Sequence, residues 1–281
     1  MLLEIEPGVR LFVDIEGPEW VPDGARLRQK PTLILVHGGP GFDHTGFKPF
    51  FSQLADLAQI VYFDQRGHGR SDPRPPQEWL LDTFADDIVR LCAKLGIEKP
   101  IVLGQSFGGF VAQRYLARHP QHPAKVILSS TSHHLGLERK VAWFGRFGGP
   151  AAAESARAFW TQPNAETWAV YERLCRPHYN TTRQPAEGAG RMVFRPEILF
   201  TSASGEQQTM NLRPGLKNVQ CPVLVMAGEQ DPVTPIDDGE EIAAALPSAS
   251  TRFERFPGVG HGAWRDDPAG ALRALRGFIS A

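Results

Sequence analysis

The sequence predicts one α/β domain in which a mostly parallel, twisted sheet with flanking helices carries a helical cap insertion. Short apolar runs alternate with helical patterns up to residue 132 and again from residue 219, which is typical of parallel strands joined by right-handed crossovers. Residues 133–218 contain helical segments rich in aromatic residues and no pattern of a buried strand. The length, 281 residues, suits a single α/β domain with such an insertion.

We therefore expect residues 1–132 and 219–281 to form the core domain, and residues 133–218 to form a helical cap, or lid. Aromatic side chains at helical spacing usually pack against one another, but a lid also uses them to contact a substrate. Both roles fit the aromatic residues of this segment.

The composition excludes several classes of partner. The formal net charge is −1 and both signs are mixed along the chain, so we expect no binding of nucleic acid or of anionic lipid. No apolar run is long enough to span a membrane, and the first residues do not resemble an export signal. Cys92, Cys175 and Cys221 are widely spaced, which favours neither a disulfide framework nor a zinc site. We expect a cytoplasmic protein that acts on a small molecule or a short peptide.

The chain begins with two alternating runs, residues 2–5 and 9–15, which are separated by a Pro-Gly pair. This pattern predicts a β-hairpin at the antiparallel edge of the sheet. Residues 17–30 are polar and contain Pro and Gly, and we expect them to form a loop. The continuous apolar run 32–36 is typical of a strand that is buried on both faces.

A helical pattern over residues 47–57 precedes a second buried strand, residues 59–63. The charged loop 64–72 follows it, at the end of the strand where open α/β sheets bind their ligands. Apolar residues then recur at helical spacing from 79 to 95 and Gly96 follows them, which predicts an amphipathic helix. We interpret four side chains of the loop as residues that fix its conformation rather than as catalysts: Asp64, Arg66, His68 and Arg70.

The next apolar run, residues 101–103, leads into the motif G-Q-S-F-G-G at residues 104–109, and a helical pattern covers residues 110–118. A strand, a sharp turn and a helix in this order hold a serine with its hydroxyl exposed, and the glycines leave room for a strained backbone. Ser106 is therefore the candidate nucleophile. The backbone N–H of Phe107, at the start of the helix, is suited to donate to a developing oxyanion.

The motif H-G-G-P-G at residues 37–41 follows the strand 32–36. Glycines in such a tight loop allow backbone N–H groups to approach a ligand closely. We expect the N–H of Gly39 to be the second oxyanion donor, with Gly38 as the next candidate.

The remaining elements are three strands over residues 125–130, 222–227 and 251–256, and two helices over residues 236–245 and 268–279. Asp231 follows the second of these strands, and His261, flanked by glycines, follows the third. A serine hydroxyl needs a base at neutral pH, a histidine is a suitable base, and a carboxylate fixes the tautomer of that histidine. Ser106, Asp231 and His261 therefore form a candidate catalytic triad. Glu229 is an alternative acid, although its loop position is less favourable than that of Asp231.

Taken together, the motifs resemble the α/β-hydrolase superfamily, and within it the proline iminopeptidase-like group, over nearly the whole chain. The motifs that carry the resemblance are H-G-G-P-G, D-Q-R-G-H-G-R-S at residues 64–71, G-Q-S-F-G-G, G-E-Q-D at residues 228–231 and G-H at residues 260–261. Esterase-like and lactonase-like relatives also carry the first two loops. The iminopeptidases often have Trp after the nucleophile, where this chain has Phe107.

The resemblance implies a serine hydrolase that needs no metal and no organic cofactor. Ser106 attacks an ester or amide carbonyl with His261 as the general base, the N–H groups of Gly39 and Phe107 hold the oxyanion, and water hydrolyses the acyl-enzyme. The group resemblance favours release of an N-terminal residue, whose free amino group is held by cap carboxylates. The insertion offers Glu138, Glu154, Glu166, Glu172, Glu187, Glu197 and Glu206.

Two alternatives stay open. An apolar rather than an anionic cavity under the cap would favour a carboxylesterase or lactonase of the same fold. A non-catalytic ligand-binding protein on this scaffold is the second alternative, and the complete set of nucleophile, base, acid and oxyanion loop argues against it. His133, His134 and His178 have no partners at metal-ligand spacing, so we expect no metal site.

Overall fold

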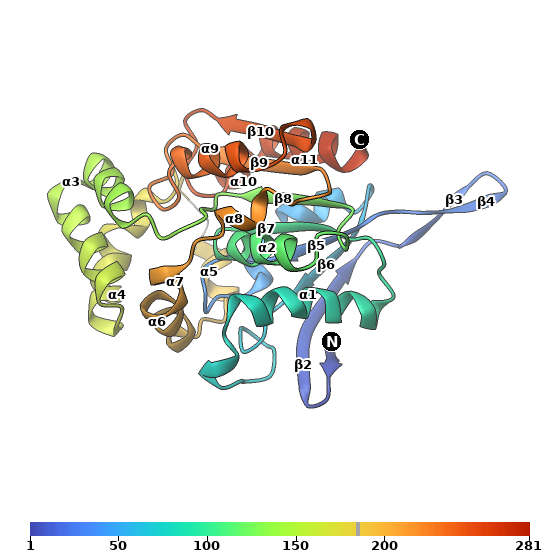
Figure 1. Ribbon diagram of the computed structural model, residues 1–281, viewed down its shortest axis with the longest axis horizontal. Helices are drawn as coiled ribbons and strands as arrows, with labels where there is room; N and C mark the ends of the chain where they lie inside the picture. Colours follow the sequence, from blue (N-terminus) through green and yellow to red (C-terminus); the bar gives the residue numbers. More distant parts are fainter. Residues whose placement is uncertain (184–185) are drawn as a thin grey trace.

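The computed structural model describes residues 1–183 and 186–281, and an eight-stranded sheet lies at its centre (Figure 1). The strands of this sheet are β1 (Leu2–Glu6), β2 (Val9–Glu16), β5 (Thr32–Val36), β6 (Gln59–Phe63), β7 (Ile101–Gln105), β8 (Lys125–Ser129), β9 (Val223–Gly228) and β10 (Thr251–Phe256). Their order is β1-β2-β6-β5-β7-β8-β9-β10. The six strands from β6 to β10 run parallel, while β2 pairs antiparallel with β1 and with β6. The predicted mostly parallel sheet and N-terminal hairpin are thus confirmed.

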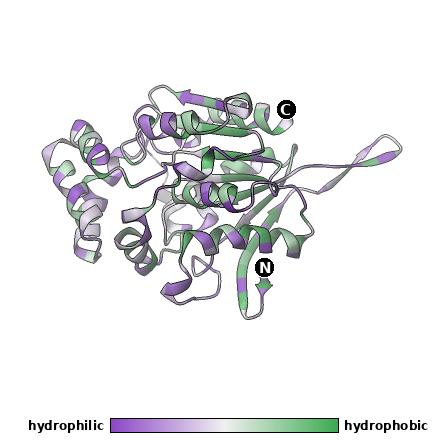
Figure 2. Ribbon diagram, viewed as in Figure 1, coloured by the Kyte–Doolittle hydropathy of each residue, from purple (hydrophilic) through white to green (hydrophobic). Residues whose placement is uncertain are grey.

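Successive residues of a strand point to opposite sides, so the apolar strands of this sheet form a core on each face. Helices cover both faces. Ile34 belongs to the core on one face and Leu35 to the core on the other. Figure 2 shows how apolar residues gather in the central strands. The first face is covered by α1 (Leu81–Leu95), α2 (Phe107–Arg118) and α9 (Ile236–Ala245), and the second by η2 (Phe50–Leu54), α10 (Ala263–Asp266) and α11 (Pro268–Ser280).

A separate group of helices lies between β8 and β9, at the left of Figure 1. Its helices are α3 (Leu137–Thr161), α4 (Ala165–Leu174), η4 (Arg176–His178), α5 (Ala186–Arg191), α6 (Pro196–Ser204) and α7 (Glu206–Thr209). A third apolar core joins α3, α4 and α6 through side chains such as Phe144, Tyr171 and Leu199. The short α8 (Arg213–Leu216) packs instead against α2 and α9, and Leu216 lies in the core of the sheet.

Two segments differ from the predicted elements. Residues 17–30, expected to form a loop, contain the two-stranded hairpin β3 (Trp20–Asp23) and β4 (Arg26–Gln29). The hairpin projects from the body, as Figure 1 shows, and β4 is exposed along its whole length, so it carries no alternating apolar pattern. Residues 47–57, expected to form a helix, contain only the short 3₁₀ segment η2, and a second one, η1 (His44–Phe47), ends where the expected helix begins. Pro49 between them has no N–H to donate to a continuous helix.

The three cysteines are free, buried thiols. Burial raises the pKa of Cys92 to about 12, which keeps that thiol in its unreactive form. Among the helices that the structure describes, we find none with both the length and the apolar character needed to cross a bilayer.

Close packing at the β7–α2 turn explains the glycines of the G-Q-S-F-G-G motif. A Cβ on Gly108 would lie 2.0 Å from the carbonyl oxygen of Val36 in β5, and one on Gly104 would lie 2.3 Å from the carbonyl oxygen of Gly108. Both distances are far below van der Waals contact. The helix α2 therefore approaches β5 as closely as it does only because position 108 lacks a side chain.

The Gly108→Ala variant is expected to lose at least about 2 kcal/mol of unfolding free energy, because the added methyl group displaces α2 from β5. Urea unfolding followed by circular dichroism measures the loss. Gly190→Ala is the matched control: a Cβ at this position of α5 meets no atom within 4 Å, and Ala is the better helix former. Equal midpoints for Gly108→Ala and the wild-type chain would show that β5 relaxes at no cost.

Candidate active site

Ser106 lies between β7 and α2 in a strained backbone conformation. Its φ is 54° and its ψ is −116°, a backbone region that residues other than Gly rarely adopt. The backbone is held there by two bonds: Ser106 N donates to Ser129 O at 3.0 Å, and Thr131 Oγ1 donates to Ser106 O at 2.8 Å. This geometry is that of the sharp strand-to-helix turn predicted from the motif, with the side chain of Ser106 on a cavity.

His261 and Asp231 form a buried pair. His261 Nδ1 lies 2.8 Å from Asp231 Oδ2, and the two residues are 5% and 0% exposed. The other oxygen of Asp231 accepts hydrogen bonds from the N–H groups of Val233 and Thr234, and Thr234 Oγ1 donates to Oδ2. These bonds fix the carboxylate of Asp231. The imidazole turns Nδ1 toward this carboxylate, so Nε2 is the ring nitrogen that the carboxylate does not contact.

The alternative acid, Glu229, is half-buried and directly follows β9. Its N–H donates to Phe256 O. The structure thus brings Asp231, and not Glu229, to the imidazole of His261.

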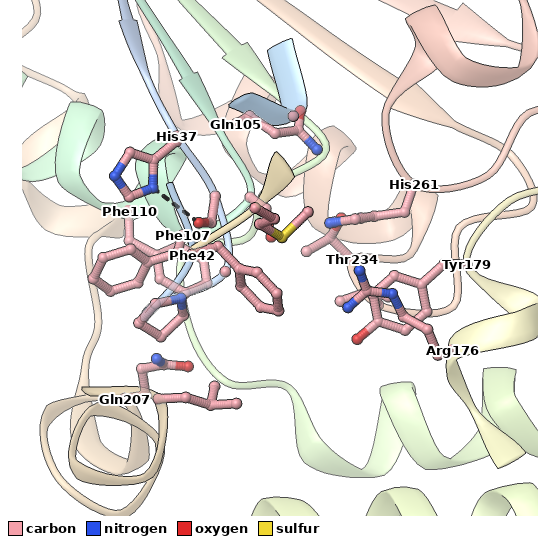
Figure 3. Close-up of a pocket in the computed structure, with 18 of the residues that line it drawn as sticks. His37, Phe42, Gln105, Phe107, Phe110, Arg176, Tyr179, Gln207, Thr234 and His261 are labelled. Carbon is pink, nitrogen blue, oxygen red and sulfur yellow. Dashed lines mark hydrogen bonds between the residues drawn. The ribbon is translucent and has the colours of Figure 1, made fainter. Parts of the chain in front are cut away.

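Ser106, His261 and both predicted oxyanion elements line one cavity of about 130 Å³ (Figure 3). Figure 3 shows His261 beside Thr234 and Tyr179, with Phe42, Phe107 and Phe110 on the other side of the space. The wall is mainly apolar, as in most small-molecule sites. Its aromatic residues come from the core domain, including α2 and α10, and from the segment between β8 and β9: Phe42, Phe47, Phe107, Phe110, Phe159, Trp160, Trp168, Tyr179 and Trp264.

The residues of the candidate oxyanion donors line the cavity. Phe107 is the first residue of α2, and the first N–H groups of a helix have no partner within it. Gly39 has φ 60°, and a Cβ there would lie 2.3 Å from the Phe42 ring. A Cβ on Gly38 would lie 2.9 Å from Gln105 O and 3.1 Å from Ser106 Cβ. The loop 37–41 therefore reaches the serine only with glycine at these two positions.

Asp64 fixes the loop that follows β6. Its carboxylate accepts hydrogen bonds from His44 Nδ1 at 2.6 Å and from Arg70 N at 2.8 Å. The bonds to His44 and Arg70 hold the pKa of Asp64 below its usual value although burial opposes this. Asp64 and Arg70 thus have the loop-fixing role that the sequence predicts.

Arg66 and His68 complete the same loop. Arg66 forms a buried, two-bond ion pair with Asp87 of α1, and His68 Nδ1 lies 2.9 Å from Arg66 O. Burial lowers the pKa of His68 to about 3, so this ring is neutral at physiological pH. Its ring stacks on that of Phe107, which links the loop to the start of α2.

The charged groups on the cavity wall differ from the cap carboxylates that the resemblance implies. Among the described residues, its one carboxylate is Asp43, which already accepts hydrogen bonds from Arg70 Nη1, Thr45 and Val193 N. None of the cap glutamates lines this cavity among the described side chains. Glu138 pairs with Arg157 and Glu206 accepts from Leu81 N, whereas the side chain of Glu187 lies outside the described residues.

Three basic side chains line the cavity instead: Lys140 of α3, Arg176 of η4 and Arg265 of α10. Burial, together with the neighbouring Arg176, lowers the pKa of Arg265 to about 10. Sequence reasoning missed all three, because a basic residue on a helix normally faces solvent and no local pattern distinguishes these.

The sequence also does not predict a second cluster of side chains, which lies outside the cavity. The ring nitrogens of His133 and His134 and a carboxylate oxygen of Glu241 lie within 4.8 Å of one another, and His133 Nε2 is 2.8 Å from Glu241 Oε2. Glu241 comes from α9, so no spacing within the sequence reveals the contact. Arg139 donates to the other oxygen of Glu241 and competes there with any cation.

The chain is similar to known proteins in both sequence and fold. Residues 31–268 match the family model of the alpha/beta hydrolase fold. Proline iminopeptidase PfmaB of Pestalotiopsis fici is 38% identical over 252 residues, which cover 85% of this chain and 88% of that protein. The crystal structure of proline iminopeptidase from Mycobacterium smegmatis has a TM-score of 0.77 at 23% identity, covering 100% of this chain and 97% of that one. Esterase EaEST of Exiguobacterium antarcticum has a TM-score of 0.72 at 19% identity, covering 100% and 99%.

The two solved structures share the fold of this chain, and the family model and the sequence relative identify its family. The predicted resemblance is thereby confirmed. The chain belongs to the α/β-hydrolase family, within its proline iminopeptidase-like group, and is a hydrolase.

Proposed function

We propose that this hydrolase cleaves a small ester or amide through an acyl-enzyme formed on Ser106. His261 takes the proton of the serine hydroxyl as the oxygen attacks the carbonyl carbon, and Asp231 stabilises the resulting imidazolium. The N–H groups of Gly39 and Phe107 hold the oxyanion. His261 then protonates the leaving group, and a water molecule, activated by the same imidazole, releases the acyl group.

One observation carries this proposal: the buried Asp231–His261 pair lies on the same cavity as a serine with φ 54°. A strained backbone at a non-glycine residue is retained where function requires it. A non-catalytic ligand-binding protein would need neither that strain nor a carboxylate behind the imidazole, so we favour catalysis over the binding alternative.

We further propose that α3 to α7 act as a lid over this site. The support is that Phe159, Trp168 and Tyr179 from this helical group line the same cavity as Ser106 and His261, and that aromatic residues of the group pack in a third apolar core. Closing such a lid excludes water from the reacting carbonyl.

Two substrate classes remain in competition. The names of the relatives favour an iminopeptidase, which releases an N-terminal residue. The cavity favours a carboxylesterase or lactonase, because the described wall carries three basic groups and a single carboxylate that is already engaged. A free ammonium group in such a site meets like charge and, among the described residues, no carboxylate that is free to pair with it. Since function is set by the site rather than the fold, we favour the ester or lactone.

A paired assay decides between them. Purified protein is given a prolyl arylamide and a short-chain aryl ester, each also with the Ser106→Ala variant, and kcat/KM is measured. We expect turnover of the ester to exceed that of the amide by more than the intrinsic reactivity of the two bonds explains. Turnover of the prolyl amide that is lost when its amine is acylated would instead establish the iminopeptidase.

A further inference from the structure

Two arginines lie where the active-site cavity meets a wider groove. Arg176 and Arg265 line both spaces, together with Gly46, Tyr179, Met192 and Trp264. Both side chains therefore lie where the groove adjoins the cavity that holds Ser106. Arg265 is half-buried and Arg176 is exposed.

Neither guanidinium has an acidic partner among the residues that the structure describes. Among the described residues, no carboxylate forms an ion pair with Arg176 or Arg265, whereas Arg66, Arg70 and Arg139 each pair with at least two. The nearby Asp266 is engaged elsewhere, since it accepts hydrogen bonds from Thr182 and from Gly260 N. Glu172 lines the groove but forms no ion pair with either guanidinium. Two positive charges that face one space repel each other, and a bound anion relieves that repulsion.

Aromatic rings hold both side chains in place. The guanidinium carbon of Arg176 lies 5.4 Å from the ring centre of Phe42 and 5.3 Å from that of Tyr179. Figure 3 shows the Arg176 head beside the Tyr179 ring, near His261. Arg265 lies over the Trp264 ring at 5.1 Å and donates from Nη1 to His261 O at 3.3 Å. Stacking on rings leaves the N–H groups of a guanidinium free for a ligand.

We propose that Arg176 and Arg265 form a subsite for a carboxylate, so that the preferred substrate is an ester or amide that also carries a negatively charged carboxylate group. The inference rests on the serine hydrolase proposed above and names its substrate class. A planar guanidinium matches a carboxylate with two parallel hydrogen bonds, and Lys140 adds a third positive charge to the same wall. The same subsite disfavours a substrate whose second charged group is an ammonium.

The test compares two aryl esters that differ in one charge: mono-p-nitrophenyl adipate and methyl p-nitrophenyl adipate. Release of p-nitrophenol gives kcat/KM for each after subtraction of spontaneous hydrolysis. In the wild-type chain we expect the anionic ester to be preferred by at least about 10-fold. Arg176→Gln should bring that ratio close to one, Arg176→Lys should retain part of it, and Arg265→Gln should lower it as well.

Arg173→Gln is the matched control, because Arg173 is an exposed residue at the end of the neighbouring α4 and lines neither space. It should keep the wild-type ratio. A wild-type preference for the neutral ester, or a ratio that Arg176→Gln leaves unchanged, would overturn the subsite.

Binding of adipate to Ser106→Ala, followed by calorimetry, separates this proposal from the catalytic one. Adipate that binds Ser106→Ala, but not the double variant Ser106→Ala/Arg176→Gln, supports the subsite whatever the nucleophile is. Hydrolysis of both esters by Ser106→Ala at wild-type rates would refute the serine mechanism and leave the subsite standing. Absence of adipate binding to Ser106→Ala would count against the subsite alone.

Discussion

Replacing Ser106 by alanine is expected to lower kcat for an aryl ester by about 10⁴- to 10⁶-fold. The Ser106 oxygen forms the covalent bond to the acyl carbon, and no other hydroxyl is held at the same turn. Serine and alanine are equally strained at the φ of 54° that this position adopts. The substitution therefore should not change the stability of the turn, and the fold should be retained. Single-turnover and steady-state release of p-nitrophenol measure the loss, and thermal melting confirms that the variant is folded.

Ser129→Ala is the matched control for this experiment. Ser129 is 1% exposed in β8, next to β7, and its Oγ makes no hydrogen bond to any part of the chain that the structure describes. Its removal should change kcat by less than about 3-fold, as expected for a residue outside the site. A fluorophosphonate should label the wild-type chain and Ser129→Ala on one serine, and should leave Ser106→Ala unlabelled. Labelling of Ser106→Ala with unchanged stoichiometry would identify a different nucleophile.

The elbow was predictable because its constraints are local. A strand, a turn and a helix that follow one another within the motif at residues 104–109 fix where Ser106 points, and the glycines are required by contacts such as the 2.0 Å approach of position 108 to Val36 O. The placement of Asp231 and His261 followed from a second rule, since parallel strands bring the loops after their carboxyl ends to one edge of the sheet. Chain order and strand direction therefore predict that the loops after β9 and β10 reach the same edge of the sheet as Ser106.

The electrostatic character of the cavity was not predictable in the same way. Arg176 and Arg265 are far apart in the sequence. They line one space because the segment that follows η4 is bonded to the residues around α10, as in the hydrogen bonds from His261 N to Tyr179 O and from Thr182 Oγ1 to Arg265 O. Nothing in either local sequence distinguishes them from surface arginines such as Arg173. The β3–β4 hairpin was missed for a related reason: exposed strands lack the alternation that burial imposes.

The choice of acid is the point at which the structure adds most to the catalytic site. Asp231 is fully buried and accepts hydrogen bonds from His261, from Thr234 and from the N–H of Val233. Glu229 is half-buried two residues earlier. Both residues lie in the loop that leaves β9, so strand alternation does not separate them. The hydrogen bonds from Val233 and Thr234 place the carboxylate of Asp231 at the imidazole.

Asp231→Asn is therefore expected to lower kcat by about 10³- to 10⁴-fold. An amide of the same shape keeps an oxygen for the N–H groups of Val233 and Thr234, so the loop is preserved, but it is neutral and does not stabilise the imidazolium that forms on His261. Its NH₂ group also favours the wrong imidazole tautomer, in which Nδ1 accepts and Nε2 carries the proton. Steady-state kinetics on the aryl ester measure the loss.

Glu229→Gln is the control, with the same change of carboxylate to amide two residues away. We expect its kcat to stay within about 3-fold of the wild-type value. If Glu229→Gln instead shows the large loss and Asp231→Asn does not, Glu229 is the acid and the loop must rearrange when substrate binds. Equal small losses in both variants would mean that His261 acts without a carboxylate partner, and the strict burial of Asp231 would then serve only the fold of the loop after β9.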